Sequence, residues 1–265
     1  MKKIVMIISL VFIVSILAAG DFTWTQLNLY QGVNMAHGWG DTYNDTYFEI
    51  EGGGRTGILD FYYFFDVNHF LGLGDNAVIG NSTTGYTRNA GDFFAKISPR
   101  FSLNKFVPSF GPVKELYVAT RYKGFNGGDD YAIGIGSDLK IPYFDIFAAN
   151  FYHVLQSSND GDDSSFEDAG YLFAINWYTK LYQFNKKFNV TYQGWSDYGF
   201  ADSYTDDLGY PNTADEFQMF NGFFWNYNKW SLSTSVKFHH HFMHSEADFG
   251  NPNETSLFFG LHRRF

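Results

Sequence analysis

Tyrosines and ionisable side chains that recur at every second position are the residues of this sequence best suited to chemistry. Tyr47 is followed by Glu49 and Glu51, and Lys96 is followed by Arg100 with the same parity. Side chains two residues apart share one face of a β-strand. Aromatic rings on such a face can stack on a flat solute, while ionisable groups hydrogen-bond its polar edges. The pattern therefore indicates a surface that binds small polar solutes.

Metal and thiol chemistry receive little support from the sequence. The chain contains no cysteine, which excludes a disulfide framework, a thiolate metal site and a cysteine nucleophile. His239, His240, His241 and His244 could be ligands, but on a strand His240 faces away from its two neighbours. Because zinc takes three or four ligands, we predict an interfacial histidine cluster, no metal site and no cofactor. The acidic segment from Asp160 to Asp168 lacks the EF-hand spacing and is interpreted as a solvated loop.

A serine hydrolase site is the enzymatic alternative. Ser231, Ser233, His239 and His241 would share one face of a strand. Ser233 and His239 are six residues apart, roughly 20 Å along a strand, so their side chains cannot touch. The sequence also lacks a nucleophile elbow of the form GxSxG. We therefore predict that the protein is not an enzyme.

Short amphipathic strands account for most of the sequence. Polar and apolar side chains alternate from Phe93 to Phe101, from Trp230 to His239 and in many other segments, and this period indicates strands rather than helices. Stretches rich in Gly, Asn, Asp and Ser separate the segments, as solvated loops do. We count about twelve candidate strands, which begin near Thr25, Tyr43, Gly57, Phe93, Val113, Tyr131, Asp145, Ala169, Phe188, Glu216, Trp230 and Ser256.

The composition excludes several classes of protein. Aromatic residues make up 21% of the 265 residues, too many for a disordered chain. The formal net charge of −10 gives no basic field for a phosphate backbone, so we exclude nucleic acid as a partner. Beyond the N-terminus, no apolar run approaches the roughly 20 residues of a transmembrane helix.

The N-terminus has the order of a secretory signal. Two lysines precede an apolar run over residues 4–17, and small residues follow up to Gly20. The sequence therefore predicts a cleaved signal peptide over residues 1–20 and a single exported domain over residues 21–265. The alternative, an uncleaved anchor helix, is short for a membrane span.

The fold depends on where the apolar strand faces are placed. A β-sandwich would bury them in a core, whereas an outer-membrane barrel turns them toward lipid and lines its lumen with polar side chains. Ionisable groups in mid-strand, aromatic clusters at Phe61–Phe65 and Phe223–Tyr227 that fit girdles, and a last strand ending on Phe265 favour the barrel. We predict an all-β fold, an antiparallel transmembrane β-barrel of about 12 strands, with Arg263 at the level of the lipid headgroups.

Several segments resemble a known protein family. They occur in one order, ahead of the closing Phe265, and are Asn44 to Glu51 (NDTYFEIE), Pro99 to Ser102 (PRFS), Ser109 to Thr120 (SFGPVKELYVAT) and Gly134 to Asp138 (GIGSD). Together they are similar to the Tsx-type nucleoside-specific channel family of the bacterial outer membrane, which includes porins known as phage receptors. The resemblance implies a monomeric twelve-stranded barrel with a narrow pore for passive diffusion of nucleosides. Residues 52–55 resemble the phage-receptor branch, because nucleoside channels carry a bulkier, lysine-bearing stretch there.

Strand parity assigns the candidate binding residues to a water-filled lumen. Tyrosines would stack on the base of a nucleoside, and charged or amide groups would bond its sugar hydroxyls. Several weak sites in series would let a solute enter and still leave. We predict stacking by Tyr47, Tyr62, Tyr117 and Tyr152, and hydrogen bonding by Glu49, Glu51, Asp60, Lys96, Arg100, Glu115, Arg121 and Asn150.

The sequence leaves two other functions open. Lys96, Arg100, Glu49 and Glu115 could pair across the lumen and set only the ion preference of a general porin. Long acidic loops could instead make the barrel a surface receptor or adhesin, for example for phages or colicins. The expected partners are nucleosides or other small polar solutes and outer-membrane lipid, and we expect a monomer.

Overall fold

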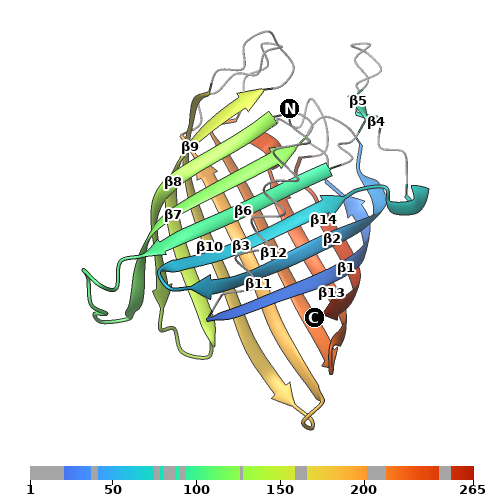
Figure 1. The fold of residues 1–265 in the computed structure, drawn as a ribbon. Helices are drawn as coiled ribbons and strands as arrows, with labels where there is room; N and C mark the ends of the chain where they lie inside the picture. The colour runs from blue at the N-terminus through green and yellow to red at the C-terminus, as the bar shows by residue number, and fades with distance from the viewer. Residues whose placement is uncertain are drawn as a thin grey trace.

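A closed antiparallel β-barrel contains most of the residues that the computed structural model describes (Figure 1). These are residues 21–36, 41–74, 78–79, 88–89, 93–125, 128–158, 166–201, 213–244 and 252–265. The predicted signal peptide over residues 1–20 and most of the acidic segment after Asp160 lie outside the described residues. The first strand pairs with the last, so the sheet closes on itself.

Twelve strands form the barrel wall in this described part of the chain. They are β1 (Phe22–Met35), β2 (Tyr43–Thr56), β3 (Leu59–Val67), β6 (Phe93–Ser102), β7 (Val113–Phe125), β8 (Gly128–Leu139), β9 (Ile146–Ser158), β10 (Glu167–Gln183), β11 (Phe188–Phe200), β12 (Asp215–Tyr227), β13 (Trp230–His240) and β14 (Thr255–Arg264). Each begins within three residues of its predicted position, which confirms the predicted fold class.

Short elements lie outside the wall. Strands β4 (Val78–Ile79) and β5 (Arg88–Asn89) pair with each other, and η1 (Phe70–Gly72) and η2 (Phe242–His244) are single 3₁₀ turns. Among the described residues, no helix has the length and apolar character needed to cross a membrane.

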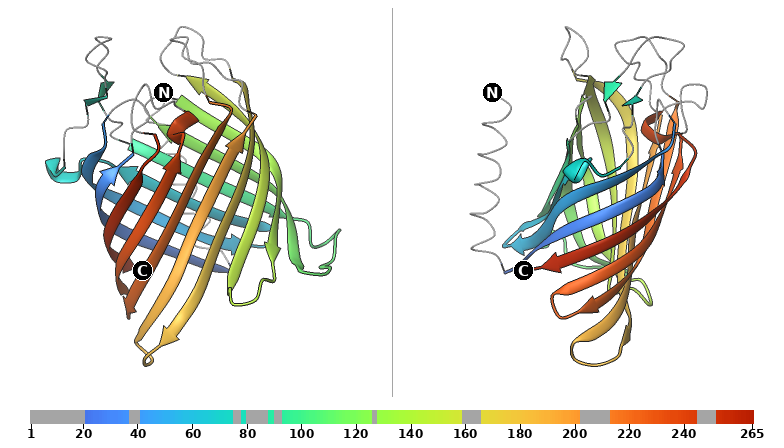
Figure 2. Two further views of the ribbon diagram at one scale, coloured as in Figure 1. Left: turned by 180° about the vertical axis from the view of Figure 1, so that it is seen from behind. Right: turned by 90° about the vertical axis from the view of Figure 1, so that its right-hand side faces the viewer.

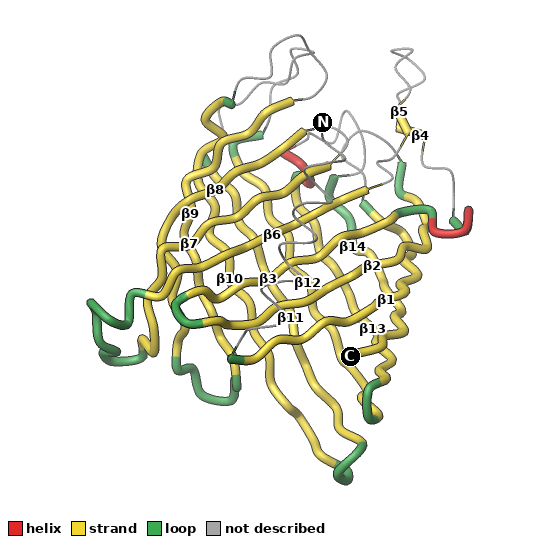
Figure 3. Tube along the Cα trace, viewed as in Figure 1, coloured by secondary structure: helices red, strands yellow, loops and turns green. Residues whose placement is uncertain are grey.

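The two ends of the barrel differ, and the strands run obliquely between them (Figure 2). At one end, here called the turn end, two residues join β2 to β3 and two join β12 to β13. Gly57 and Asn228 in these turns have φ of 57° and 54°, as tight hairpins require. The start of β1 and the end of β14 also lie at the turn end, and η1 and η2 mark the opposite, loop end (Figure 3).

Strand alternation sorts the side chains between the two faces of the wall. On β8, Ile133 is 58% exposed and Ile135 is 65% exposed. Ala132, the residue before Ile133 in the same strand, is 6% exposed. Phe259 and Leu261 on β14 are likewise exposed, but His262 is buried. The outer face is therefore an apolar belt suited to hydrocarbon, and the polar face points inward.

The aromatic clusters are not girdles as a whole, and this corrects the sequence interpretation. In β3, Tyr62 faces inward and hydrogen-bonds Glu51, whereas Tyr63 faces outward. In β12, Phe224 is buried and its neighbour Phe223 is exposed. Consecutive strand residues point to opposite faces, so only every second ring of such a run can contribute to an outer girdle.

Candidate functional site

The inner wall of the barrel contains all twelve residues predicted to bind a solute. Each has the inward parity of its strand, next to outward apolar residues such as Ile50, Val118 and Phe151. The twelve come from β2, β3, β6, β7 and β9, and are Tyr47, Glu49, Glu51, Asp60, Tyr62, Lys96, Arg100, Glu115, Tyr117, Arg121, Asn150 and Tyr152. They therefore share one surface, although they do not form one compact cluster.

An acidic group occupies the lumen side of β2 and β3. Asn28 of β1 donates its amide to Glu49 and, over 3.0 Å, to Glu51. The hydroxyl of Tyr62 donates to Glu51 over 2.7 Å. Tyr47 stacks on Tyr30, with 5.0 Å between the ring centroids. The structure thus brings two predicted carboxylates and two predicted tyrosines to the same part of the wall.

His262 extends this network to the strands that close the barrel. Its Nδ1 lies 2.8 Å from Asn28 Oδ1, and its Nε2 lies 2.7 Å from Ser233 Oγ. Ser233 of β13 therefore contacts a histidine of β14 and not His239, which lies on β13 as Ser233 does. Because Ser233 is 4% exposed and His262 is 1% exposed, we interpret the network as a support of the wall.

Two arginines are held by carboxylates nearer the turn end. Arg100 lies 2.7 Å from Asp60 and 2.9 Å from Asp138. Arg55 binds Glu115 through both of its terminal nitrogens, at 2.7 and 2.5 Å. The alternative in which Arg100 pairs with Glu49 or Glu115 across the lumen is not what the structure shows. Arg100 binds Asp60 and Asp138 instead, Glu115 binds Arg55, and Glu49 accepts from Asn28.

A further ion pair and an aromatic group lie in mid-barrel. Arg121 binds Asp197 of β11 over 2.7 Å. The ring of Trp195 lies 5.8 Å from the ammonium of Lys96 and 5.1 Å from that of Lys237. Asp197, Trp195 and Lys237 are not among the binding residues predicted from the sequence. The signal was present, since the same alternation applied to β11 and β13 places all three on the inner face.

The predicted tyrosines differ in how accessible their rings are. Tyr117 is fully buried, its hydroxyl donates to Asp138, and its ring lies 4.1 Å from the Arg100 guanidinium. Tyr152 is 3% exposed. Tyr47 and Tyr62 retain partial exposure. The last two rings are therefore the more available to a solute in the lumen.

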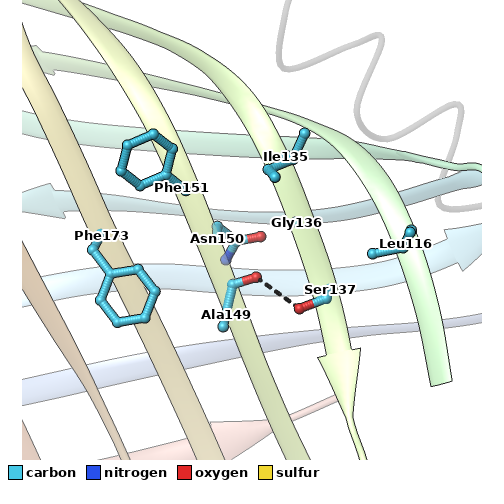
Figure 4. Close-up of a pocket in the computed structure, with 8 residues that line it drawn as sticks. All are labelled: Leu116, Ile135, Gly136, Ser137, Ala149, Asn150, Phe151 and Phe173. Carbon is cyan, nitrogen blue, oxygen red and sulfur yellow. Dashed lines mark hydrogen bonds between the residues drawn. The ribbon is translucent and has the colours of Figure 1, made fainter. Parts of the chain in front are cut away.

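A shallow depression of about 200 Å³ lies on the outer face, away from these groups (Figure 4). Phe151 of β9 and Phe173 of β10, both exposed, lie along it. Within it, the Ser137 hydroxyl donates to the carbonyl of Ala149 over 3.4 Å. Its position among outward apolar residues separates it from the lumen.

Comparison with known proteins identifies the family of this barrel. Residues 19–260 match the family model described as nucleoside-specific channel-forming protein, Tsx. The chain belongs to the Tsx family. The match covers most of the chain, so family membership applies to the whole barrel and confirms the resemblance.

Relatives of this Tsx-family chain are outer-membrane proteins. It is 31% identical over 222 residues to outer membrane protein OmpK of Vibrio parahaemolyticus, covering 82% of this chain and 77% of the relative. It is 30% identical over 230 residues to OmpK of Vibrio parahaemolyticus serotype O3:K6, with the same coverage. Among solved structures it resembles a KdgM porin, at 9% identity and a TM-score of 0.44, over 91% of this chain and 99% of that chain.

These findings give the location of the barrel. The chain is a bacterial outer-membrane β-barrel of a channel-forming family, which is not a family of enzymes. The predicted localisation is therefore confirmed. Because barrels of this kind have short periplasmic turns and longer extracellular loops, the turn end is periplasmic and the loop end is extracellular.

Proposed function

We propose that the barrel lets nucleosides and similar small polar solutes cross the outer membrane by passive diffusion. The composition of the inner wall carries this proposal. Trp195 stacks on Phe220, with 6.3 Å between the centroids and 10° between the planes, and the ammonium groups of Lys96 and Lys237 lie close to the same indole. Such a wall offers π-faces and hydrogen-bond donors to one solute at the same depth.

A nucleoside has the chemistry that these groups can bind. Its base is flat and uncharged, and stacking on an aromatic side chain is worth about 1–3 kcal/mol per base. Its sugar hydroxyls can donate to carboxylates such as Glu49 and Glu51. Several such weak sites along one wall allow a solute to bind and still leave. Diffusion down a gradient then needs no energy input.

The proposed roles within the predicted set follow from exposure. Tyr47 and Tyr62 keep partial exposure, so they are the proposed stacking residues. Tyr117 and Tyr152 lie 4.1 and 5.8 Å from the guanidinium groups of Arg100 and Arg121, and hold these cations at the wall. The remaining polar members of the set are proposed to bond the sugar and the edges of the base.

The barrel is proposed to act as a monomer in outer-membrane lipid. Its sheet is closed, so within the described strands every wall strand has two neighbours and no strand edge is left to pair with a strand of another subunit. The exposed apolar belt, with Ile133 and Phe259 among its members, matches the acyl chains of a bilayer.

Single-channel recording in a planar bilayer tests the proposed solute. Adenosine or thymidine should block the current at concentrations at which glucose and glycine do not. Tyr47→Ala and Tyr62→Ala should each weaken the block roughly tenfold, which corresponds to about 1.4 kcal/mol of lost stacking. Tyr198→Ala, on the outer face of β11, is the matched control and should leave it unchanged. Equal block by all four solutes would contradict nucleoside specificity and indicate a general porin.

A further inference from the structure

The extracellular end of β13 brings together two histidines that strand alternation would separate. On a continuous strand, His239 and His241 would share a face and His240 would point away. His241 instead has φ of 50°, in the left-handed region that histidine enters more readily than most residues. The rings of His240 and His241 therefore stack, with 3.8 Å between their centroids and 28° between their planes.

A carboxylate from the neighbouring strand completes this cluster. Asp215 begins β12, two residues before Phe217, which pairs with His240. The Nδ1 atom of His241 lies 3.2 Å from Asp215 Oδ1. One potential ligand atom from each of Asp215, His240 and His241 can be chosen so that all three lie within 4.8 Å of one another. The arrangement corrects the expectation that His240 points away from His241.

We propose that Asp215, His240 and His241 bind a divalent transition-metal ion such as Zn²⁺ on the outer side of the extracellular rim. Imidazole and carboxylate ligands are a common donor set for zinc, and three protein ligands leave a fourth position for water. Ligands about 2.0–2.2 Å from a tetrahedral zinc lie about 3.4 Å apart. The 3.2 Å between His241 Nδ1 and Asp215 Oδ1 is close to that separation, and His240 offers a ligand atom within 4.8 Å of the other two residues.

The surroundings leave the cluster accessible and hold its backbone in place. His240 is exposed, and the side chains of His241 and Asp215 keep 26% and 40% of their accessible surface. The backbone N–H of His241 donates to Asn253 Oδ1 over 2.9 Å, which fixes the left-handed turn from the opposite side of the loop. A metal ion can thus reach the site from the extracellular side while the barrel stays closed.

The other histidines nearby have different environments. His239 faces the lumen, is 9% exposed and packs 4.5 Å from the ring of Phe242. The Nδ1 atom of His244 lies 2.9 Å from the carbonyl oxygen of Thr213. Neither is needed for the proposed ligand set.

Zinc binding to the full-length barrel, purified in detergent with an affinity tag that contains no histidine and then stripped with EDTA, tests the proposal. Isothermal titration with ZnCl₂ should give one ion per barrel. His240→Asn and Asp215→Asn should each weaken binding roughly tenfold or more, since each removes a direct ligand.

His153→Asn is the matched control for these variants. His153 pairs with Asp168 over 3.1 Å. This pair is also exposed and lies toward the same rim, but it belongs to strands in a different part of the wall. This variant should bind zinc as the wild type does. Equal weakening in His153→Asn, or unchanged binding in both Asp215→Asn and His240→Asn, would overturn the assignment.

Cobalt substitution gives a readout that does not depend on the folding of any variant. Wild-type barrel loaded with Co²⁺ should show the visible absorption bands of a tetrahedral site, and excess Zn²⁺ should abolish them. A spectrum without these bands at a saturating Co²⁺ concentration would also overturn the proposal.

Discussion

Arg121 of β7 and Asp197 of β11 form an ion pair inside the barrel, with 2.7 Å between Nη1 and Oδ2. Three wall strands separate β7 from β11 along the sheet, so the pair connects distant parts of the wall. The two side chains keep only 4% and 9% of their accessible surface. Each charge therefore depends on the other for compensation.

Asp197→Asn should lower the free energy of unfolding by roughly 3–5 kcal/mol, because it leaves the Arg121 guanidinium buried without its counter-ion. The double variant Arg121→Gln with Asp197→Asn should recover most of that loss. Urea unfolding in detergent, followed by tryptophan fluorescence, measures both. Asp168→Asn, which breaks the exposed pair with His153, is the control and should change stability by about 0.5 kcal/mol or less. A similarly small effect of Asp197→Asn would contradict this account.

The glycine segment of β2 allows a close contact on the outer face. Gly52 lies between Thr25 of β1 and Tyr63 of β3 in the strand register. Tyr63 crosses over Gly52, and its hydroxyl lies 3.1 Å from Thr25 Oγ1. A β-carbon at Gly52 would lie 2.6 Å from Cζ of Tyr63 and 2.7 Å from the carbonyl oxygen of Trp24. This contact gives a structural reason for a glycine at position 52.

Gly52→Ala should destabilise the barrel by roughly 1–3 kcal/mol through overpacking against Tyr63. In a Tyr63→Ala background the same substitution should cost less, because one of the two clashing groups is gone. The double-mutant cycle is measured by the same unfolding assay. If Gly52→Ala costs as much without the tyrosine ring as with it, the clash with Tyr63 is not the cause.

Much of the fold could be predicted from the sequence, because the two-residue period of a strand is a property of the backbone. That period located the wall strands and placed Glu49, Lys96 and Arg100 on the inner face. The partners of these residues could not be predicted, since Arg121 meets Asp197 only when the sheet closes with a particular register. Parity within one strand also missed the contact of Ser233 with His262, because His262 belongs to another strand.

The histidine cluster shows a different limit. The prediction for His240 and His241 assumed that the strand continues through both residues. One left-handed residue at position 241 reverses the direction of its side chain. Nothing in the alternation of polar and apolar residues reports where a strand ends to within one residue, so this juxtaposition became visible only in three dimensions.

Cysteine labelling tests most directly whether charged residues line a conducting lumen. The chain has no cysteine of its own, so Lys96→Cys and Ile97→Cys each introduce a unique thiol on opposite faces of β6. A charged, membrane-impermeant methanethiosulfonate reagent should lower the single-channel current of Lys96→Cys and leave Ile97→Cys unchanged. A current that responds at position 97 and not at position 96 would contradict the inward orientation on which the channel function depends.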